Sequence, residues 1–421
     1  MTLAITLRTL VFTVNIIAVL VIAGVLAYRV LSVRRAPKEV EPQNLTPFYD
    51  DETLENEHLT RVLRWTLLFS SIVAIVLPLY WVLEPGRQSA EAEGFEERAI
   101  ERGATLYAND QMPEYDAAKS LLCATCHGTD SAGGSAPFVI TPEAQGDTEA
   151  RPVQVSWAAP ALDTVFYRFN DCTAEELAEE AANCARAEQQ VTQIITYGRP
   201  GTPMPAWGIA GGGPKNAQAV SDLVAYLKSI QVSPAQAKAQ VGKDVVALQD
   251  QAASALKTAR QNLAAAREDL AAAESVTARA AAEIKVARAE EAIVRSRAFK
   301  TEVDRASQGK LLFMTQCARC HTNGWSYNDP TNALVPLPGP MGGGAFGPSL
   351  TGGSVLEQFP GEPADDPKTP GYQKQYAWVG EGVENNKGYG VRGISSGRMP
   401  HFGQIFTQDQ IDAVVTYERN L

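Results

Sequence analysis

Two long apolar stretches stand near the amino-terminal end of the chain. Residues 9–28 and residues 65–83 contain no charged side chain, and each has about the 20 residues that a helix needs to cross the hydrocarbon core of a bilayer. Trp65 and Trp81 lie at the two ends of the second stretch, where the membrane–water interface favours aromatic rings. The pattern predicts a transmembrane helical hairpin over residues 1–84.

The charges around these stretches predict which way the hairpin faces. The connecting loop, residues 29–64, is rich in arginine and lysine, whereas Arg8 alone precedes the first stretch. Loops with an excess of positive charge stay in the cytoplasm. A cleaved signal peptide at the first stretch would invert the second one. We therefore expect a multi-pass cell-membrane protein with the loop in the cytoplasm and the amino terminus and the remaining chain outside.

Beyond the hairpin, the same order of features occurs twice, which indicates two copies of one domain. The first copy is expected over residues 92–233 and the second over residues 307–421. Each copy ends in a stretch with apolar residues at helical spacing, residues 217–230 and residues 409–421. Such spacing is typical of an amphipathic helix that packs on its own domain.

A helical insertion, residues 234–306, separates the two copies. From residue 244 to residue 307 there is no glycine or proline, and alanine and charged residues dominate, which favours helix. Leu256, Leu263 and Leu270 repeat with a coiled-coil period. Since one straight helix of this length would reach about 95 Å, we expect an antiparallel hairpin that turns near residues 275–278. The predicted fold class is all-α throughout.

The length and net charge of the chain limit the classes of protein to which it can belong. A chain of 421 residues is long enough for several domains. The net charge of -11 and the pI near 5.1 exclude a typical nucleic-acid binder, which needs a basic surface for phosphates. An acidic surface suits a basic soluble partner instead, although acidity can also serve solubility alone.

Four of the six cysteines form two Cys-x-x-Cys-His motifs, a known signature of covalent c-type haem attachment. Zinc sites pair two such half-motifs within about 12 to 20 residues, and these motifs lie nearly 200 apart. Thioredoxin-like chemistry needs a strand and a helix around the motif, and the flanking sequence does not favour them. The motif residues are Cys123, Cys126 and His127 in the first copy, and Cys317, Cys320 and His321 in the second.

Each motif is followed by a proline and then by a Met-Pro pair at nearly the same interval. Met204 comes 77 residues after its motif histidine, and Met399 comes 78 after the second. An aromatic residue follows each methionine. The proline and aromatic positions are Pro160 and Trp207 in the first copy, and Pro348 and Phe402 in the second.

On these residues, both copies resemble class I cytochrome c domains. The resemblance implies two covalently bound haem c groups, with the four motif cysteines as thioethers, His127 and His321 as proximal ligands, and Met204 and Met399 as sixth ligands. It also implies that the carbonyls of Pro160 and Pro348 accept a hydrogen bond from the proximal histidines, and that Trp207 and Phe402 pack against the haems. The crossing of the first and last helices would bring Gly103 and Tyr107 to Tyr226, and Gly309 and Phe313 to Tyr417.

Two other residues compete with Met399 for the sixth position in the second copy. Met341 stands in a glycine-rich loop before Pro348, on the expected proximal side, and His401 stands two residues after Met399. Met399 is preferred because it keeps the interval found in the first copy. A His ligand would lower the reduction potential relative to His/Met ligation.

Cys172 and Cys184 stand apart from both motifs. Because the domains are expected in an oxidising compartment, we predict that these two cysteines form a disulfide. A pair of buried free thiols is the alternative.

A saturated iron with a methionine ligand suits single-electron transfer and leaves no position for a substrate. The expected function is therefore a membrane-anchored dihaem cytochrome c without a substrate site of its own. Its resemblance to actinobacterial dihaem subunits implies a quinol-oxidising bc-type complex, with cytochrome b and Rieske subunits, membrane lipid, and a terminal oxidase or soluble carrier as partners. The alternatives are an electron-donating subunit of a terminal oxidase and the cytochrome subunit of a periplasmic dehydrogenase.

Overall fold

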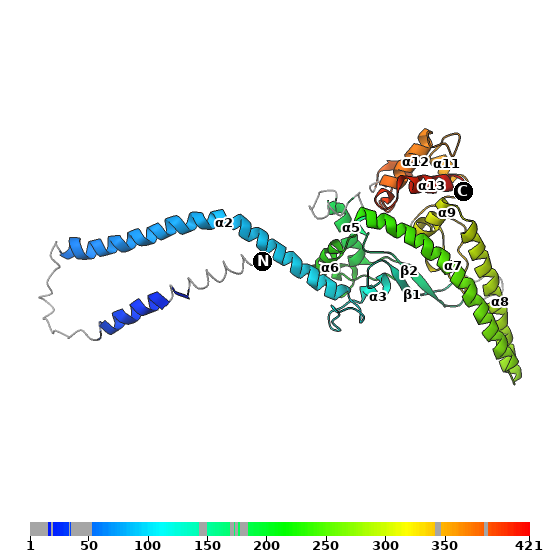
Figure 1. The fold of residues 1–421 in the computed structure, drawn as a ribbon, viewed down its shortest axis with the longest axis horizontal. Helices are drawn as coiled ribbons and strands as arrows, with labels where there is room; N and C mark the ends of the chain where they lie inside the picture. The colour runs from blue at the N-terminus through cyan, green and yellow to red at the C-terminus, as the bar shows by residue number, and fades with distance from the viewer. Residues whose placement is uncertain are drawn as a thin grey trace. The chain divides into compact units, whose positions relative to one another are not determined.

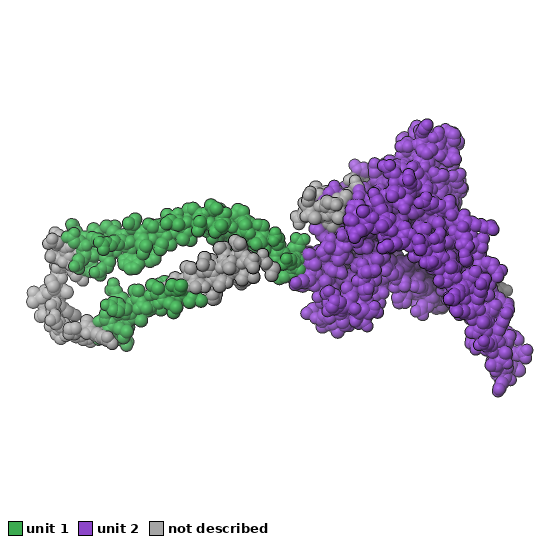
Figure 2. Space-filling model, viewed as in Figure 1, with its two compact units in different colours: residues 1–98 green, residues 99–421 purple. Residues whose placement is uncertain are grey.

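The computed structural model describes residues 16–17, 20–32, 34, 53–142, 150–168, 172, 176, 184–341, 347–382 and 386–421. These residues are mostly helical and include two small antiparallel sheets of two strands each (Figure 1). They divide into two compact units, residues 1–98 and residues 99–421 (Figure 2). The predicted all-α class is right in its helical character, and the strands are an addition to it.

Helix α2 is continuous from Thr60 to Tyr107 and follows a π-helical stretch, η1 (Thr53–Leu59). Among the described residues, it is the helix long and apolar enough to cross a membrane, whereas Leu20–Ser32 is a shorter apolar helix. Much of the first predicted span, residues 9–28, lies outside the described residues. The helix runs without a break from the second predicted span, residues 65–83, into the first repeat.

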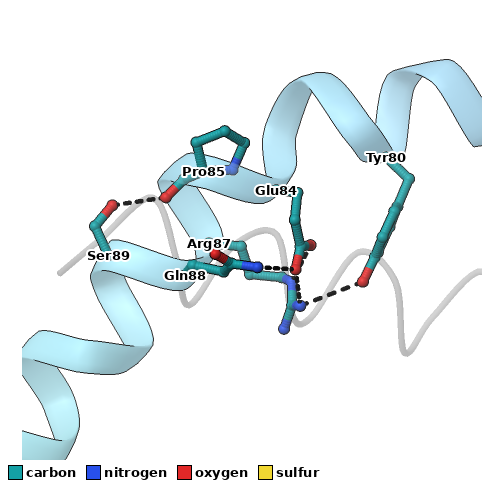
Figure 3. Close-up of polar contacts among 6 residues, drawn as sticks. All are labelled: Tyr80, Glu84, Pro85, Arg87, Gln88 and Ser89. Carbon is teal, nitrogen blue, oxygen red and sulfur yellow. Dashed lines mark hydrogen bonds and ion pairs between the residues drawn. The ribbon is translucent and has the colours of Figure 1, made fainter.

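Polar side chains bridge successive turns of α2 where its apolar stretch ends (Figure 3). The Arg87 guanidinium donates to both carboxylate oxygens of Glu84 and to the hydroxyl of Tyr80, and Gln88 also donates to Glu84. Residues three and four apart lie on one helix face. These bonds span Pro85, which lacks an N–H donor and lies inside the helix.

The first repeat combines short helices with a β-hairpin. Strand β1 pairs antiparallel with β2, from Gly134 opposite Ala159 to Ile140 opposite Val153. Apolar and polar residues alternate from Val153 to Trp157 in β2, as expected of a strand with two different faces. The elements are α3 (Cys123–His127), β1 (Gly134–Ile140), β2 (Val153–Ala159), η2 (Phe166–Arg168), α5 (Cys184–Tyr197), η3 (Ile209–Gly211) and α6 (Ala217–Ser229).

The insertion is an antiparallel hairpin of α7 (Pro234–Ala271) and α8 (Val276–Arg305). Ser233 caps α7 in a capping box with Gln236, and proline follows at the first helical position. Small alanines line the contact between the helices and are buried there, while ion pairs Arg267–Glu290 and Lys285–Asp269 cross between the helices outside it. The predicted hairpin is present, and it turns just before the expected position.

The second repeat is built from short helices and one further β-hairpin. Thr407 caps its last helix in a capping box with Gln410. The elements are α9 (Gln308–Leu312), η4 (Phe313–Cys317), α10 (Ala318–His321), η5 (Trp325–Tyr327), α11 (Ser354–Gln358), α12 (Pro370–Glu381), β3 (Gly388–Tyr389), β4 (Gly393–Ile394), η6 (Phe402–Gln404) and α13 (Gln408–Arg419).

In each repeat, the first and last helices touch backbone to backbone at a glycine. A Cβ atom on Gly103 would lie 2.0 Å from the carbonyl oxygen of Asp222, and one on Gly309 would lie 2.0 Å from that of Ala413. Beside each glycine an aromatic pair closes the crossing, with ring centroids 5.2 Å apart for Tyr107–Tyr226 and 5.4 Å apart for Phe313–Tyr417. The two repeats therefore share one packing geometry.

We predict that Gly309→Ala lowers the free energy of unfolding by about 1–3 kcal/mol, because the added methyl forces two backbones apart. Gly242→Ala is the matched control, since Gly242 also lies in a helix but a Cβ there would meet nothing within 4 Å. The control should gain up to about 1 kcal/mol from helix propensity. Denaturant unfolding of both variants measures the difference, and equal effects would contradict the close contact.

Candidate functional site

Each Cys-x-x-Cys-His motif forms a short helical turn whose histidine is held by a proline carbonyl. The Nδ1 atom of His127 lies 2.9 Å from the carbonyl oxygen of Pro160, and that of His321 lies 2.9 Å from the carbonyl oxygen of Pro348. A carbonyl oxygen only accepts, so Nδ1 carries the proton and donates. The Nε2 atom of each ring is then left with a lone pair.

The surroundings of both imidazoles favour the neutral form. Burial lowers the pKa of His127 and of His321, and the hydrogen bond to the proline carbonyl opposes this shift only in part. Around His321 the backbone also approaches closely, because a Cβ on Gly347 would lie 2.5 Å from the ring Nδ1. The site therefore fixes the orientation and the tautomer of the ring together.

The four motif cysteines are free thiols in the structure. Burial raises the pKa of all four, to about 12 for Cys123 and well above its ordinary value for Cys317. Thiol–disulfide exchange depends on a thiolate, which needs a lowered pKa. The environment of these thiols thus disfavours thioredoxin-like chemistry, in agreement with the sequence argument.

The expectation of two covalently bound haem c groups is contradicted by the arrangement of the described side chains. Among the described residues, no group of three or more His, Cys, Asp or Glu side chains comes together in a way that could hold a metal ion. The cysteines and the histidine of each motif, although adjacent in sequence, form no such group.

The two methionines lie in loops outside the helices and strands. The carbonyl of Met204 accepts a hydrogen bond from the Arg199 N–H at 3.0 Å, and Met399 packs, partly buried, against the core of the second repeat. Met341 pairs by its backbone with Thr322, next to the motif histidine. The ligand roles expected for Met204 and Met399 stay predictions.

The aromatic residues that follow the methionines are both packed into the interior. Trp207 lies partly buried against the core of the first repeat, and Phe402 is buried in the core of the second. The backbone of Trp207 is fixed by a hydrogen bond from its N–H to the Ile195 carbonyl at 3.0 Å. A structural role in the core accounts for both contacts.

Cys172 and Cys184 are joined by a disulfide with a Cα–Cα distance of 5.0 Å. Both are buried in the core of the first repeat, beside Phe166 and the helix α5 that begins at Cys184. The bridge ties the start of α5 to the segment that follows η2.

Alkylation of the unreduced, denatured protein should leave Cys172 and Cys184 unlabelled, because their sulfurs are bonded to each other. Reduction before alkylation should label both. Peptide mass spectrometry reads each position separately, and labelling without reduction would count against the bridge.

A buried carboxyl that the sequence analysis missed lies close to the second motif. Glu418, near the end of α13, is 5% exposed, and one oxygen accepts a hydrogen bond from Gln375 at 3.0 Å. The neighbouring Arg419 donates instead to Gln375 and to backbone carbonyls, including that of Phe359. Burial raises the pKa of Glu418 to about 7, so this carboxyl gains its proton near neutral pH. The sequence feature that could have indicated the burial of Glu418 is its position after Val414 and Val415, on the apolar face of α13.

We predict that Glu418→Gln removes a pH-dependent loss of stability. In the unfolded chain the carboxyl ionises near its ordinary pKa of 4.5, while in the folded protein it keeps its proton up to a pKa of about 7. The wild-type group therefore lowers the free energy of unfolding progressively from pH 4.5 to pH 7.

The glutamine variant should gain on the wild type by about 3 kcal/mol over this interval. Unfolding at pH 4 and at pH 8 measures the gain. The exposed Glu274→Gln serves as the control and should not change the profile. A constant difference between Glu418→Gln and wild type at the two pH values would show that Glu418 ionises normally.

Comparisons with known proteins leave the chain without an assigned relative. No protein-family model, curated protein or solved structure matches it.

Proposed function

We propose that the chain is a membrane-anchored electron-transfer subunit of a respiratory chain. In this proposal it stands between the Rieske subunit of a quinol-oxidising bc-type complex and a terminal oxidase, and passes electrons singly. Its two outer repeats resemble class I cytochrome c domains. The chain has no substrate site of its own in this role, and the quinol is oxidised elsewhere in the complex.

The observation that supports the proposal is the repetition of one site geometry. Both motif histidines donate from Nδ1 to a proline carbonyl at 2.9 Å. Both repeats also cross their first and last helices at a glycine with an aromatic pair beside it. Two sites of equal construction in one chain suit a relay better than a single catalytic centre. The buried, protonated thiols further favour a role without thiol exchange.

The membrane arrangement in the proposal follows from the charge pattern. The loop of residues 29–64 would lie in the cytoplasm because it carries the excess of arginine and lysine. The outer repeats would then face the same side as the Rieske centre. The long apolar helix α2 would contact lipid and the cytochrome b subunit.

The redox group is not part of the proposal, since the described residues offer no metal-binding cluster. The identity of the redox group can be measured directly on the protein purified from native membranes. A pyridine haemochrome assay gives the content of covalently attached haem per chain.

Purification from native membranes through a carboxy-terminal tag should bring down cytochrome b and Rieske subunits. The preparation should oxidise quinol, and inhibitors of the bc quinol site should block it. Isolation with a haem-copper oxidase alone, or with a soluble dehydrogenase alone, would favour one of the other two assignments.

Single substitutions test whether the two motifs take part in this electron transfer. His127→Ala and His321→Ala should each stop electron flow to the oxidase while the Rieske centre is still reduced by quinol. His58→Ala, in the loop expected in the cytoplasm, is the matched control and should keep full activity. Unimpaired electron flow in both motif variants would overturn the proposal.

A further inference from the structure

Between its apolar stretch and the first repeat, helix α2 passes through a segment that contains no buried residue. All of residues 84–98 are helical, yet only Glu84 and Gly94 are half-buried and the others are exposed. A helix of this length is marginally stable in water when it has no face packed against other parts of the protein. The segment therefore lacks the burial that stabilises α6 and α13.

The same segment contains residues that weaken a helix from within. Pro85 has no N–H to donate to the preceding turn, and Gly86 follows it directly. A Cβ on Gly86 would meet nothing within 4 Å, so no close contact requires a glycine there. Proline and glycine are the residues least favourable to the interior of a helix. Pro78 also lies in α2, but inside the apolar stretch, where a bilayer would offer no water to replace lost backbone hydrogen bonds.

Side chains bridge the weak point at Pro85 (Figure 3). Glu84 accepts hydrogen bonds from Arg87 at 2.8 and 2.5 Å and from Gln88 at 3.0 Å. The Arg87 guanidinium also donates to the Tyr80 hydroxyl at 3.2 Å. These four side chains, here called the Glu84 network, connect the turn before Pro85 to the turn after it.

The Glu84 network can open at small cost. Its hydrogen bonds are exposed to solvent, and the side chain of Arg87 is 49% exposed. Exposed ion pairs contribute little to stability and are screened by salt. The continuity of α2 across Pro85 therefore depends on bonds that are weaker than the packing of a core.

We propose that Pro85 and Gly86 form a hinge in α2 and that the Glu84 network is its latch. With the network closed, α2 is one continuous helix from Thr60 to Tyr107, as in the structure. When the network opens, the helix bends at the hinge, and the repeats change direction relative to the apolar stretch. Segments with few buried contacts are those in which such motions occur. The inference does not depend on the proposed electron-transfer function, because it rests on α2 alone.

Hydrogen–deuterium exchange of the full chain, measured by mass spectrometry, tests the latch. Glu84→Gln should increase the exchange rate of the amides of residues 86–98 by about threefold, because the ion pair with Arg87 is lost. Arg87→Gln removes the other partner of the pair and should have the same effect. Glu91→Gln is the matched control, since Glu91 is exposed on the same helix, and it should leave the rate unchanged.

Ionic strength gives a second measurement on the same proteins. An increase from about 0.1 M to about 1 M salt screens exposed charges, so exchange in residues 86–98 should become faster in the wild type and in Glu91→Gln. Glu84→Gln has no ion pair left to screen and should not respond. Equal exchange in Glu84→Gln and Glu91→Gln, or a salt response that persists in Glu84→Gln, would overturn the latch.

The bending is measured by the distance between two spin labels, one at Val73 and one at Glu97, both exposed. Attachment through a noncanonical amino acid leaves the native cysteines unlabelled. In an unbroken helix these positions lie about 36 Å apart. Glu84→Gln should broaden the distance distribution toward shorter values, whereas Pro85→Ala combined with Gly86→Ala should narrow it. Distributions that are alike in these two variants and the wild type would overturn the hinge.

Discussion

Direct contact between two helix backbones is the constraint on which each repeat depends. At Gly103 and at Gly309 a carbonyl of the last helix occupies the space that a side chain would need. This approach brings the aromatic pairs together, and the Cys-x-x-Cys-His motifs follow in the chain after the first helix. The hydrogen bond between Nδ1 and the proline carbonyl then sets the histidine ring in one orientation. If these two helices shifted relative to each other, the Cys-x-x-Cys-His motif that follows the first helix would shift as well.

The repeats are joined by a shared interior and not by a simple linker. The core of the second repeat includes Tyr167 from the first repeat and Ala237 and Val241 from α7. Asp244 of α7 accepts a hydrogen bond from Gln316, next to Cys317, at 2.7 Å. The start of the insertion therefore packs in the core of the second repeat, and the rest of the hairpin extends away from it.

Much of the fold could be predicted from local sequence patterns, whereas the remaining features depend on long-range packing. Helical spacing and the absence of glycine and proline predicted the α7–α8 hairpin. Its turn is defined by the Ser275 cap of α8, and no glycine marks this position in the sequence. The alternation in residues 153–157 could have indicated β2, but no strand was expected in an all-helical domain. The motif pattern predicted a cofactor that the grouping of the described side chains contradicts, because adjacency in sequence does not make side chains converge. Glu418 was missed because burial of a single carboxyl depends on contacts with α12.

The antiparallel form of the insertion has an evolutionary consequence. Since α7 leaves the body of the protein and α8 returns to it, the two ends of the hairpin stay fixed whatever its length. Equal segments removed from both helices near the turn would shorten the arm and keep the Arg267–Glu290 type of cross-helix pairing in register. A deletion in one helix alone would displace every alanine contact beyond it. Lineages that inherit this architecture are therefore free to vary the reach of the arm, but only in matched steps on its two sides.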